Sequence, residues 1–418
     1  MIGVIAVALV LDGQEPYREP RAKPAAVPPA SLTAAEVARI ARRVERIRGL
    51  RFEHAVRPLF VGRSEAIRLE QEAGAKDQRN STRAADAEAL KLLGLLQPRD
   101  SLAKAFSTIE GEQVLGFYDD RRKRLVVIRD RHANRPLLEI TLAHELTHAL
   151  EDQRFGLRAG GSTDDAALAR SALAEGTATV VMAEYAVRYF GISDALALFE
   201  AASGDETKLP RYVEDTLLFP YEQGVNFVEA FRPDGGSWKA LDNVIRFRRP
   251  VTAEQVLHPD KYAIDERAVP IRMPDLGREL GPAWQRMASS SVGEDDLREI
   301  FKIVGRRPNP GAAAGWGGGR FELFERRRKG DCVAPCVSGD VGAMALAWDT
   351  AADRRAGEAA LAAAFERGLR GRALGRRGSV RLWSSRGGTI ALAGTGLRTA
   401  IVFAPDSGLA ARLLARFA

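Results

Sequence analysis

Thr141-Leu-Ala-His-Glu-Leu-Thr-His-Ala-Leu150 constrains the fold and chemistry of this chain more than any other stretch. It carries His144, Glu145 and His148 in the pattern His-Glu-x-x-His, inside an apolar run typical of a helix. Residues four apart share one helix face, so both imidazoles can reach one metal ion, with Glu145 beside it. Histidine is scarce, at 5 in 418 residues, and residue frequencies give roughly one chance match per few hundred such sequences. The segment predicts a metal site of the kind found in zinc hydrolases.

A catalytic zinc ion needs three protein ligands and one open position. The predicted helix from Ala166 to about Phe190 contains Ser171-Ala-Leu-Ala-Glu-Gly-Thr-Ala178, in which Glu175 lies among small residues. Small side chains let two helices approach closely, and a carboxylate needs that closeness to reach a metal held by the first helix. We therefore predict Glu175 as the third ligand. Glu184, on a more ordinary amphipathic stretch, is the weaker alternative.

The rest of the sequence predicts an α+β fold in two parts, residues 31–278 and 279–418. In the first part, a capping box at Thr33–Glu36 predicts the start of a helix, and a strand is expected at 55–61. A charged turn between two apolar runs predicts a β-hairpin formed by 112–118 and 124–128. Helices follow to about residue 231. In the second part, the expected strands are 321–324, 343–348, 380–383, 389–393 and 400–403, and the expected helices are 294–304, 351–368 and 406–417.

The motif and its surroundings resemble a known group of enzymes. His144-Glu-x-x-His148 followed by Glu175 in a Glu-Gly-x-Ala context resembles the gluzincins, the thermolysin-like zinc metallopeptidases. More closely, His-Glu-Leu-Thr-His-Ala-Leu-Glu-Asp-Gln, the preceding Gly-Phe-Tyr-Asp and the later Gly315-Trp-Gly-Gly are similar to a largely uncharacterised family of bacterial zincin-like proteins. The similarity extends over most of residues 40–410, but only its metal motif is specific. The chain departs from that family's pattern at Gly319, where an acidic residue is usual.

The resemblance implies a mainly helical zincin-like domain with a small β-sheet over residues 31–278, which hydrolyses peptide bonds with Zn²⁺. His144, His148 and Glu175 would bind the ion, which lowers the pKa of its water to about 7. Glu145 would take that water's proton and pass it to the leaving amine. The residues after His148 lack the glycine and third histidine of the metzincins. A metal-binding zincin scaffold without hydrolytic activity is the alternative, and a structural protein without metal is a third possibility.

Substrate binding and catalysis need further groups. The hairpin strand Leu125–Ile128 is expected at the cleft rim, where it could hold an extended peptide or protein substrate by strand addition. A donor for the oxyanion is also needed. Tyr221 is the first candidate, followed by His258 and Tyr262, and each could equally be a buried structural residue.

Two residues one helical turn beyond the ligands, Thr179 after Glu175 and Asp152 after His148, are candidate partners that orient those ligands. A place on the helix surface would explain both equally well. Trp316 is predicted to pack within a tight loop.

Composition excludes some partners. The formal charge of +7 is spread along the chain, and the densest basic stretch, Arg367–Arg386, contains one aromatic residue, Trp383. Nucleic-acid surfaces usually combine basic residues with stacking aromatics, so no nucleic-acid partner is expected. No stretch is long and apolar enough to span a membrane. The sequence carries no signal for an oligomeric state.

The N-terminus and the two cysteines bear on location. Residues 1–11 are apolar but too short to cross a bilayer, and residues 15–30 are proline-rich. We read residues 1–30 as a leader and linker and expect an extracytoplasmic (periplasmic or secreted) protein, although the usual basic start of a signal peptide is missing, so a cytoplasmic location is the alternative. Cys332 and Cys336 could close a small disulfide loop or remain two free thiols.

Overall fold

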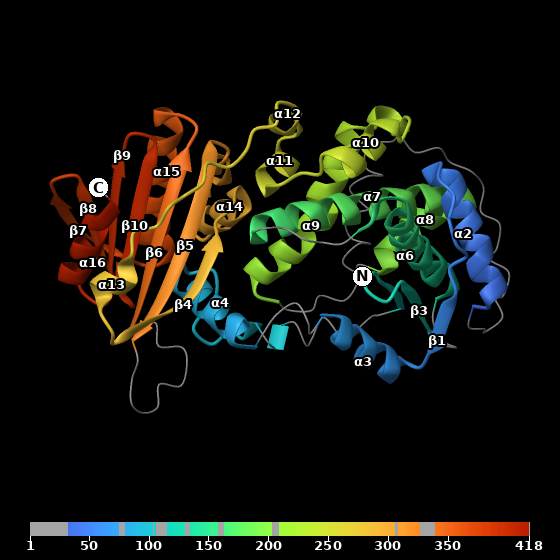
Figure 1. Cartoon of the computed structure of the whole chain (residues 1–418), viewed down its shortest axis with the longest axis horizontal. Helices are drawn as coiled ribbons and strands as arrows, with labels where there is room; N and C mark the ends of the chain where they lie inside the picture. Colours follow the sequence, from blue (N-terminus) through green and yellow to red (C-terminus); the bar gives the residue numbers. More distant parts are fainter. Residues whose placement is uncertain are drawn as a thin grey trace.

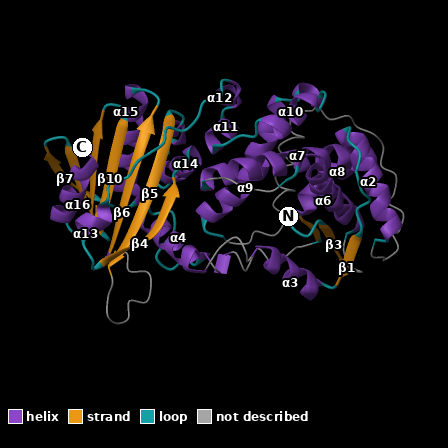
Figure 2. Ribbon diagram, viewed as in Figure 1, coloured by secondary structure: helices purple, strands orange, loops and turns teal. Residues whose placement is uncertain are grey.

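A computed structural model describes residues 32–74, 80–102, 104–105, 115–129, 134–157, 163–202, 209–305, 308–326 and 339–417. The chain folds into a helical lobe and a sheet lobe, which lie side by side (Figures 1 and 2). The α+β class expected from the sequence is confirmed. Residues 1–30 and both cysteines lie outside the described ranges. Within those ranges, no helix has the length and apolar character needed to cross a membrane.

The helical lobe begins as the sequence predicts. The Thr33 hydroxyl accepts from the Glu36 N–H, the Glu36 carboxylate accepts from the Thr33 N–H, and Gly49 ends the helix with a φ of 70°. Long helices then carry most of the lobe. The helices are α2 (Ala34–Arg48), α3 (Arg63–Gly74), α6 (Arg135–Phe155), α7 (Asp164–Phe190), α8 (Ile192–Ala202), α9 (Arg211–Ala230), α10 (Lys239–Phe247), α11 (Ala253–Leu257) and α12 (Pro259–Ala263).

The core of the helical lobe forms where α2, α6, α7 and α9 pack together. Helices α6 and α7 are buried around most of their circumference, which places polar motif residues inside the lobe. The apolar side chains that fill this core include Ile40, Leu142, Leu146, Val181, Tyr185 and Phe227.

A small sheet covers one side of α6. Its strands are β1 (Pro58–Val61), β2 (Gly116–Asp119) and β3 (Arg124–Ile128), in the order β1-β3-β2. The predicted hairpin is confirmed as β2 and β3, which pair antiparallel, while β1 runs parallel to β3. Because β3 has a neighbour on both sides, the expectation that Leu125–Ile128 receives a peptide strand is wrong. The edge strand next to α6 is β2.

The sheet lobe is built on seven strands in the order β4-β5-β6-β10-β9-β8-β7, all antiparallel. Both faces of the sheet are covered, so inner strands bury alternate residues on opposite sides: Ile401 of β10 faces one core and Val402 the other. The strands are β4 (Trp284–Ser291), β5 (Trp316–Arg326), β6 (Asp340–Trp348), β7 (Arg372–Arg377), β8 (Val380–Ser385), β9 (Gly388–Thr395) and β10 (Arg398–Ala404).

Helices pack on both faces of this sheet. Helices α14 (Glu294–Lys302) and α15 (Ala351–Ala363) contribute to the core on one face, and α13 (Leu276–Leu280) and α16 (Ser407–Leu414) to the core on the other. The five strands predicted here are all present, but β4 and β7 were not predicted. These two are the edges of the sheet, and none of their residues is fully buried, so they lack the apolar pattern that reveals a buried strand.

The two lobes are also joined by packing contacts. Helix α4 (Asn80–Leu92) comes from the first part of the chain but packs on β4, and its Ala85 and Leu92 belong to a core of the sheet lobe. Helix α11 contacts α14 as well. The domain boundary proposed at residue 278 therefore stays a prediction.

Candidate metal centre

Helix α6 presents the two motif histidines. Asn134 caps its first turn by accepting from the Leu137 N–H, Pro136 lies within that turn, and Gly156 ends the helix with a φ of 71°. His144 and His148 project from one face, as residues four apart must. Both rings are largely buried, with 9% and 12% of their side-chain surfaces exposed.

Glu175 reaches these histidines from α7, whose position depends on a close crossing with α9. A Cβ atom on Gly176 would lie 2.2 Å from the backbone carbon of Gly224, so the two helix backbones touch there. The small residues around Glu175 therefore do allow a close helix approach. The closest approach at Gly176 is to α9, which the sequence did not indicate, while α7 also packs against α6.

Three side-chain atoms converge between α6 and α7. The two Nε2 atoms of His144 and His148 are 3.0 Å apart. The Oε2 atom of Glu175 is 3.1 Å from the Nε2 of His144 and 3.4 Å from that of His148. The predicted trio thus forms one of the two groups of potential metal ligands found among the described residues.

The donor set fits Zn²⁺. Zinc takes imidazole nitrogen and carboxylate oxygen at about 2.0–2.2 Å, so ligand atoms around a tetrahedral ion lie about 3.3 Å apart. The three separations of 3.0, 3.1 and 3.4 Å are close to that value. The Nδ1 atom of His144 is buried without a hydrogen-bond partner among the described residues, so that ring lacks the outer acceptor that zinc-binding histidines usually have.

The charges at this point favour a cation. Burial raises the pKa of Glu175, but the charge of His148 and hydrogen bonds from both imidazoles outweigh it and hold that pKa well below its usual range. Burial lowers the pKa of His148, but the charge and hydrogen bond of Glu175 outweigh burial and raise this pKa to about 9. A carboxylate thus stays ionised beside the two imidazoles and offers the negative charge that a metal cation requires.

Glu145 is held next to the trio by the edge strand β2. The Tyr118 N–H donates to Oε2 of Glu145 at 2.8 Å. In the β2–β3 ladder the Ile128 N–H donates to the Leu115 carbonyl, and hydrogen-bonded pairs alternate along such a ladder. Gly116 and Tyr118 therefore direct their backbone groups away from β3, toward the open edge. The Gly-Phe-Tyr-Asp segment carries part of the family resemblance, but no pattern in the sequence predicts a role for Tyr118.

Tyr221, the first candidate for the oxyanion donor, lies at the same site. Its hydroxyl donates to Glu175, and its ring lies nearly parallel to that of His144, with centroids 6.3 Å apart. Burial and the charges of Glu175 and Glu145 raise the pKa of Tyr221 well above its ordinary value. The hydroxyl therefore keeps its proton and can donate it in a hydrogen bond. Its helix, α9, is the one that crosses α7 at Gly224.

The other candidate donors have structural partners elsewhere. The His258 ring contacts the buried Glu294 of α14 at 2.9–3.0 Å, so the structure pairs it with the sheet lobe and not with the converging trio. The Tyr262 hydroxyl donates to the Arg248 carbonyl at 2.5 Å, and its ring packs between Phe227 and Phe231. Both residues are explained by packing.

The remaining polar residues of the two helices separate in the same way. Glu184, the alternative third ligand, forms an ion pair with Arg232 at 2.8 Å. The Thr179 hydroxyl is buried and has no partner among the described side chains and backbone. Asp152 contacts no ligand directly: it binds the Tyr118 hydroxyl, the Lys123 ammonium and the Leu157 N–H. The prediction that Asp152 orients a histidine is therefore wrong.

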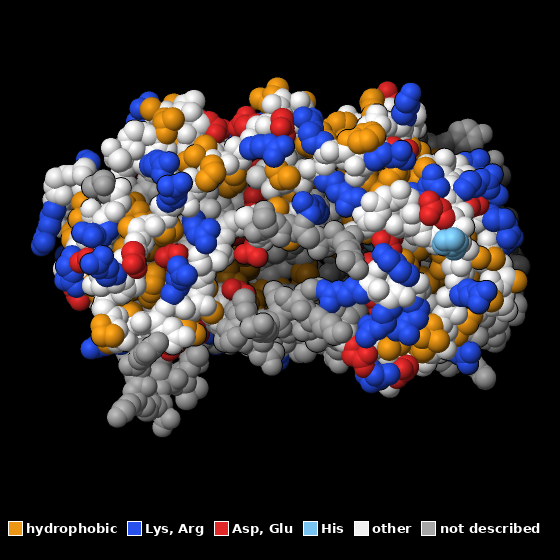
Figure 3. Space-filling view, viewed as in Figure 1, with side chains coloured by type: hydrophobic (Ala, Val, Ile, Leu, Met, Phe, Trp, Pro, Cys, Tyr) orange, Lys and Arg blue, Asp and Glu red, His pale blue; other side chains and the backbone are white. Residues whose placement is uncertain are grey.

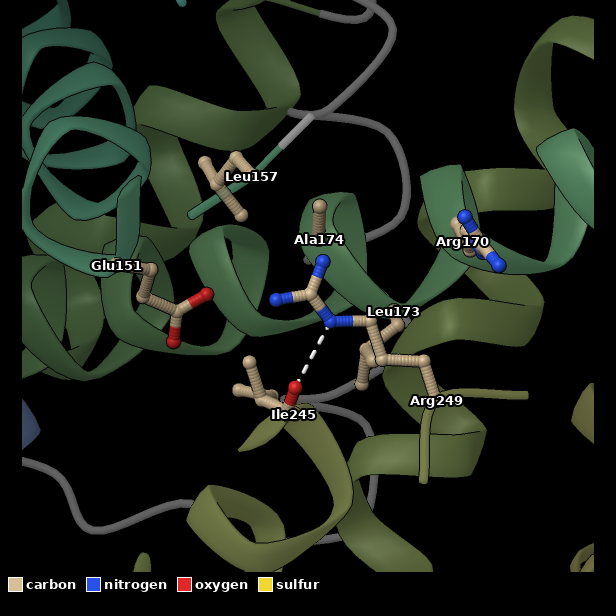
Figure 4. Close-up of a pocket in the computed structure, with 7 residues that line it drawn as sticks. All are labelled: Glu151, Leu157, Arg170, Leu173, Ala174, Ile245 and Arg249. Atoms are coloured by element: carbon tan, nitrogen blue, oxygen red, sulfur yellow. Dashed lines mark hydrogen bonds between the residues drawn. The ribbon is translucent and has the colours of Figure 1, made fainter. Parts of the chain in front are cut away.

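A small pocket lies between α6, α7 and the residues at the end of α10 (Figure 4). The Arg249 guanidinium lies near Glu151 and Ala174, and Arg170 also lines the pocket. The Arg249 guanidinium donates to the carbonyls of Ile245, Phe155 and Gly156. Arg249 thus closes the carboxyl end of α6 and leaves little room for a ligand.

The second group of potential ligands, Glu254, Glu266 and Asp349, already surrounds a cation. The Lys261 ammonium lies 2.6, 3.1 and 2.7 Å from these three carboxylates and also donates to the Ala314 carbonyl at 3.0 Å. Burial lowers the pKa of Lys261, but its hydrogen bonds to Asp349 and Glu254 more than offset this, so the pKa is raised.

Lys and Arg side chains are spread over both lobes on the face shown in Figure 3. In the arginine-rich stretch 367–386, the Trp383 ring is buried and its indole N–H donates to Glu366 at 3.0 Å. It is not available for base stacking. The absence of a nucleic-acid partner stays a prediction. Trp316 is likewise buried, as expected, but it begins strand β5, so the prediction of a tight loop at this residue is wrong.

A match to a known family covers much of the sheet lobe. A family model described as "Domain of unknown function (DUF8575)" matches residues 280–413. This range runs from the last residue of α13 into α16 and includes none of α6, α7 or α9. Curated proteins and solved structures give no match to the chain. The metal centre therefore has to be interpreted from its own chemistry.

Proposed function

We propose that this protein is a zinc-dependent metallopeptidase of the gluzincin type, with a zincin-like helical lobe. The observation that carries the proposal is the convergence of two imidazole nitrogens and one carboxylate oxygen within 3.0–3.4 Å of one another. A second carboxylate, that of Glu145, follows His144 directly on α6. A binding scaffold would need the trio but would not need a base beside the metal. The presence of that base supports hydrolysis over the scaffold alternative.

The residues divide the reaction between them. His144, His148 and Glu175 would hold the ion, which when bound acts as a Lewis acid and makes water acidic enough to ionise near neutral pH. Glu145 accepts the proton of the attacking water and returns it to the leaving nitrogen. The Tyr118 N–H fixes one oxygen of Glu145 and leaves the other for this transfer. Tyr221 donates its hydroxyl hydrogen to the developing oxyanion.

The substrate we propose is an extended peptide lying along the open edge of β2. Gly116 and Tyr118 direct backbone groups to that edge, and one of them, the Tyr118 N–H, already contacts Glu145. A peptide that pairs with the remaining groups would have its backbone next to the base. An extracytoplasmic location, expected from residues 1–30, belongs to the same proposal.

The decisive variant is Glu145→Gln, which keeps the size of the side chain but removes the base. We expect about one zinc per chain in both proteins by elemental analysis. Hydrolysis of a mixed peptide library should fall by about 100- to 10,000-fold in the variant, the usual contribution of a general base. Chelation should abolish the wild-type activity, and zinc should restore it. Full activity in Glu145→Gln would refute the mechanism, and zinc binding without any wild-type hydrolysis would favour the scaffold.

A further inference from the structure

We propose that Asp152 is a positioning residue that docks the β2–β3 hairpin on α6 and so keeps the Tyr118 N–H on Glu145. The inference rests on the proposed function, because it assigns Glu145 the role of base. It concerns the hairpin and not the metal ligands, and Asp152 itself contacts neither Glu145 nor the trio.

Both oxygens of Asp152 are fully engaged. Oδ2 accepts from the Tyr118 hydroxyl at 2.7 Å and from the Lys123 ammonium at 2.5 Å. Oδ1 accepts from the same ammonium at 2.6 Å and from the Leu157 N–H at 2.9 Å. The side chain of Asp152 is 0% exposed, whereas that of Lys123 is 52% exposed. A buried carboxylate is costly unless it is hydrogen-bonded in this way.

The geometry connects this carboxylate to the base. Asp152 and Glu145 are seven residues apart on α6, which is two helical turns, so they share one face. Tyr118 bridges them: its backbone N–H binds Glu145, and its hydroxyl binds Asp152. The edge strand is thus attached to the helix at two points through a single residue.

Lys123 adds a third point of attachment at the turn of the hairpin. It has a φ of 51°, a left-handed conformation that is uncommon for a residue with a side chain. The ammonium that this turn carries back to α6 binds the same carboxylate as the Tyr118 hydroxyl. Burial raises the pKa of Asp152, but the bonds from Leu157, Lys123 and Tyr118 lower it further, so the carboxylate is charged near neutral pH.

The test reads the Tyr118 amide directly. In Asp152→Ala, we expect hydrogen exchange at the Tyr118 amide to accelerate by roughly tenfold or more, because hydrogen bonds to a charged group have been lost. Zinc content should stay at that of the wild type. With a peptide substrate, kcat should fall by roughly tenfold while KM changes less, since Glu145 would be misplaced for proton transfer.

Tyr118→Phe provides a second variant that removes a single oxygen atom and carries the same test if Asp152→Ala does not fold. In Tyr118→Phe the amide of residue 118 should also lose protection from hydrogen exchange. The variant that combines both changes should lose no more protection than Asp152→Ala alone, because both changes break the same hydrogen bond. Glu151→Gln is the matched control. Glu151 is the preceding residue on α6 and is equally buried, but it binds Arg48 of α2 at 2.7 Å. It should lower stability and leave Tyr118 protected.

The outcomes separate this inference from the proposed function. Unchanged protection of the Tyr118 amide in Asp152→Ala overturns the positioning role, as does a loss of protection equal to that in Glu151→Gln. An exposed amide with unchanged kcat also overturns it. Wild-type protein that binds zinc but hydrolyses no peptide contradicts the proposed function, and the exchange rates would then still decide whether Asp152 places Tyr118.

Discussion

The two groups of potential metal ligands in this protein differ in where their positive charge comes from. Glu254, Glu266 and Asp349 surround the ammonium of Lys261, a cation that the chain supplies. The trio of His144, His148 and Glu175 surrounds no side-chain cation, and its three donor atoms face one another at 3.0–3.4 Å. Proximity of ligand-type residues does not by itself indicate a metal site. What distinguishes the trio is that its donor atoms face one another, with no lysine or arginine among their partners in the described part of the chain.

The largest expected effect is on zinc binding by the trio. Glu175→Gln replaces a carboxylate oxygen by an amide and should weaken zinc affinity by more than about 100-fold, since even outer partners of a zinc ligand contribute 10- to 100-fold. Competition with a chromogenic chelator measures this. Glu184→Gln, on the same helix, is the control and should bind zinc like the wild type. Equal losses in both variants would remove the distinction between the two groups.

The group of carboxylates around Lys261 can be made to resemble the trio by removing the Lys261 ammonium. Lys261→Met leaves three carboxylates together, one of them, Glu254, almost fully buried. We expect the free energy of unfolding to fall by about 3 kcal/mol, as for other buried ion pairs that lose one partner. Urea denaturation measures the loss. Added Ca²⁺, which prefers oxygen ligands, should restore part of it in the variant and have no effect on the wild type. Stability unaffected by the substitution would mean that Lys261 is not needed as the internal cation.

The geometry of the trio also depends on the close crossing of α7 and α9. In Gly176→Ala the new methyl group would overlap the backbone of Gly224, so α7 and α9 must separate. We expect a loss of about 2 kcal/mol in stability and weaker zinc binding, because Glu175 moves with α7. Gly277→Ala in α13 is the matched control. Its nearest neighbour would be 3.6 Å away, and alanine favours helix, so its stability should not fall. Both can be compared by urea denaturation.

The smallest expected effect concerns His258, which lies near Lys261 and whose charge depends on pH. The hydrogen bond and charge of Glu294 raise the pKa of His258 above its ordinary value, against the opposing effects of burial and Lys261. Because the folded pKa is the higher one, the contribution to stability is complete below the unfolded pKa and is lost as pH rises through the folded pKa. His258→Gln should therefore cost about 1 kcal/mol at pH 5.5 and close to nothing at pH 9. A pH-independent difference in urea unfolding would contradict this.

Local sequence was enough to predict that His144 and His148 lie together, because their spacing alone puts them on one helix face. Glu175 was also predicted to join them, although the closest approach of its small neighbours is to α9, a helix that the sequence did not indicate. The role of Tyr118 depends on how a hairpin docks on a helix 27 residues away, and no local pattern reports such a contact. Strands β4 and β7 were missed because edge strands have little apolar surface to bury.

The packing of α4 has a practical consequence for work with fragments of this protein. Leu92 fits against Gly342 of β6 so closely that a methyl group on that glycine would lie 2.5 Å from it. A polypeptide cut at the limits of the family match, residues 280 and 413, lacks this helix and would expose apolar surface to water. Such a polypeptide should be recovered in quantity only when residues 80–96 are fused to it or co-expressed as a separate peptide.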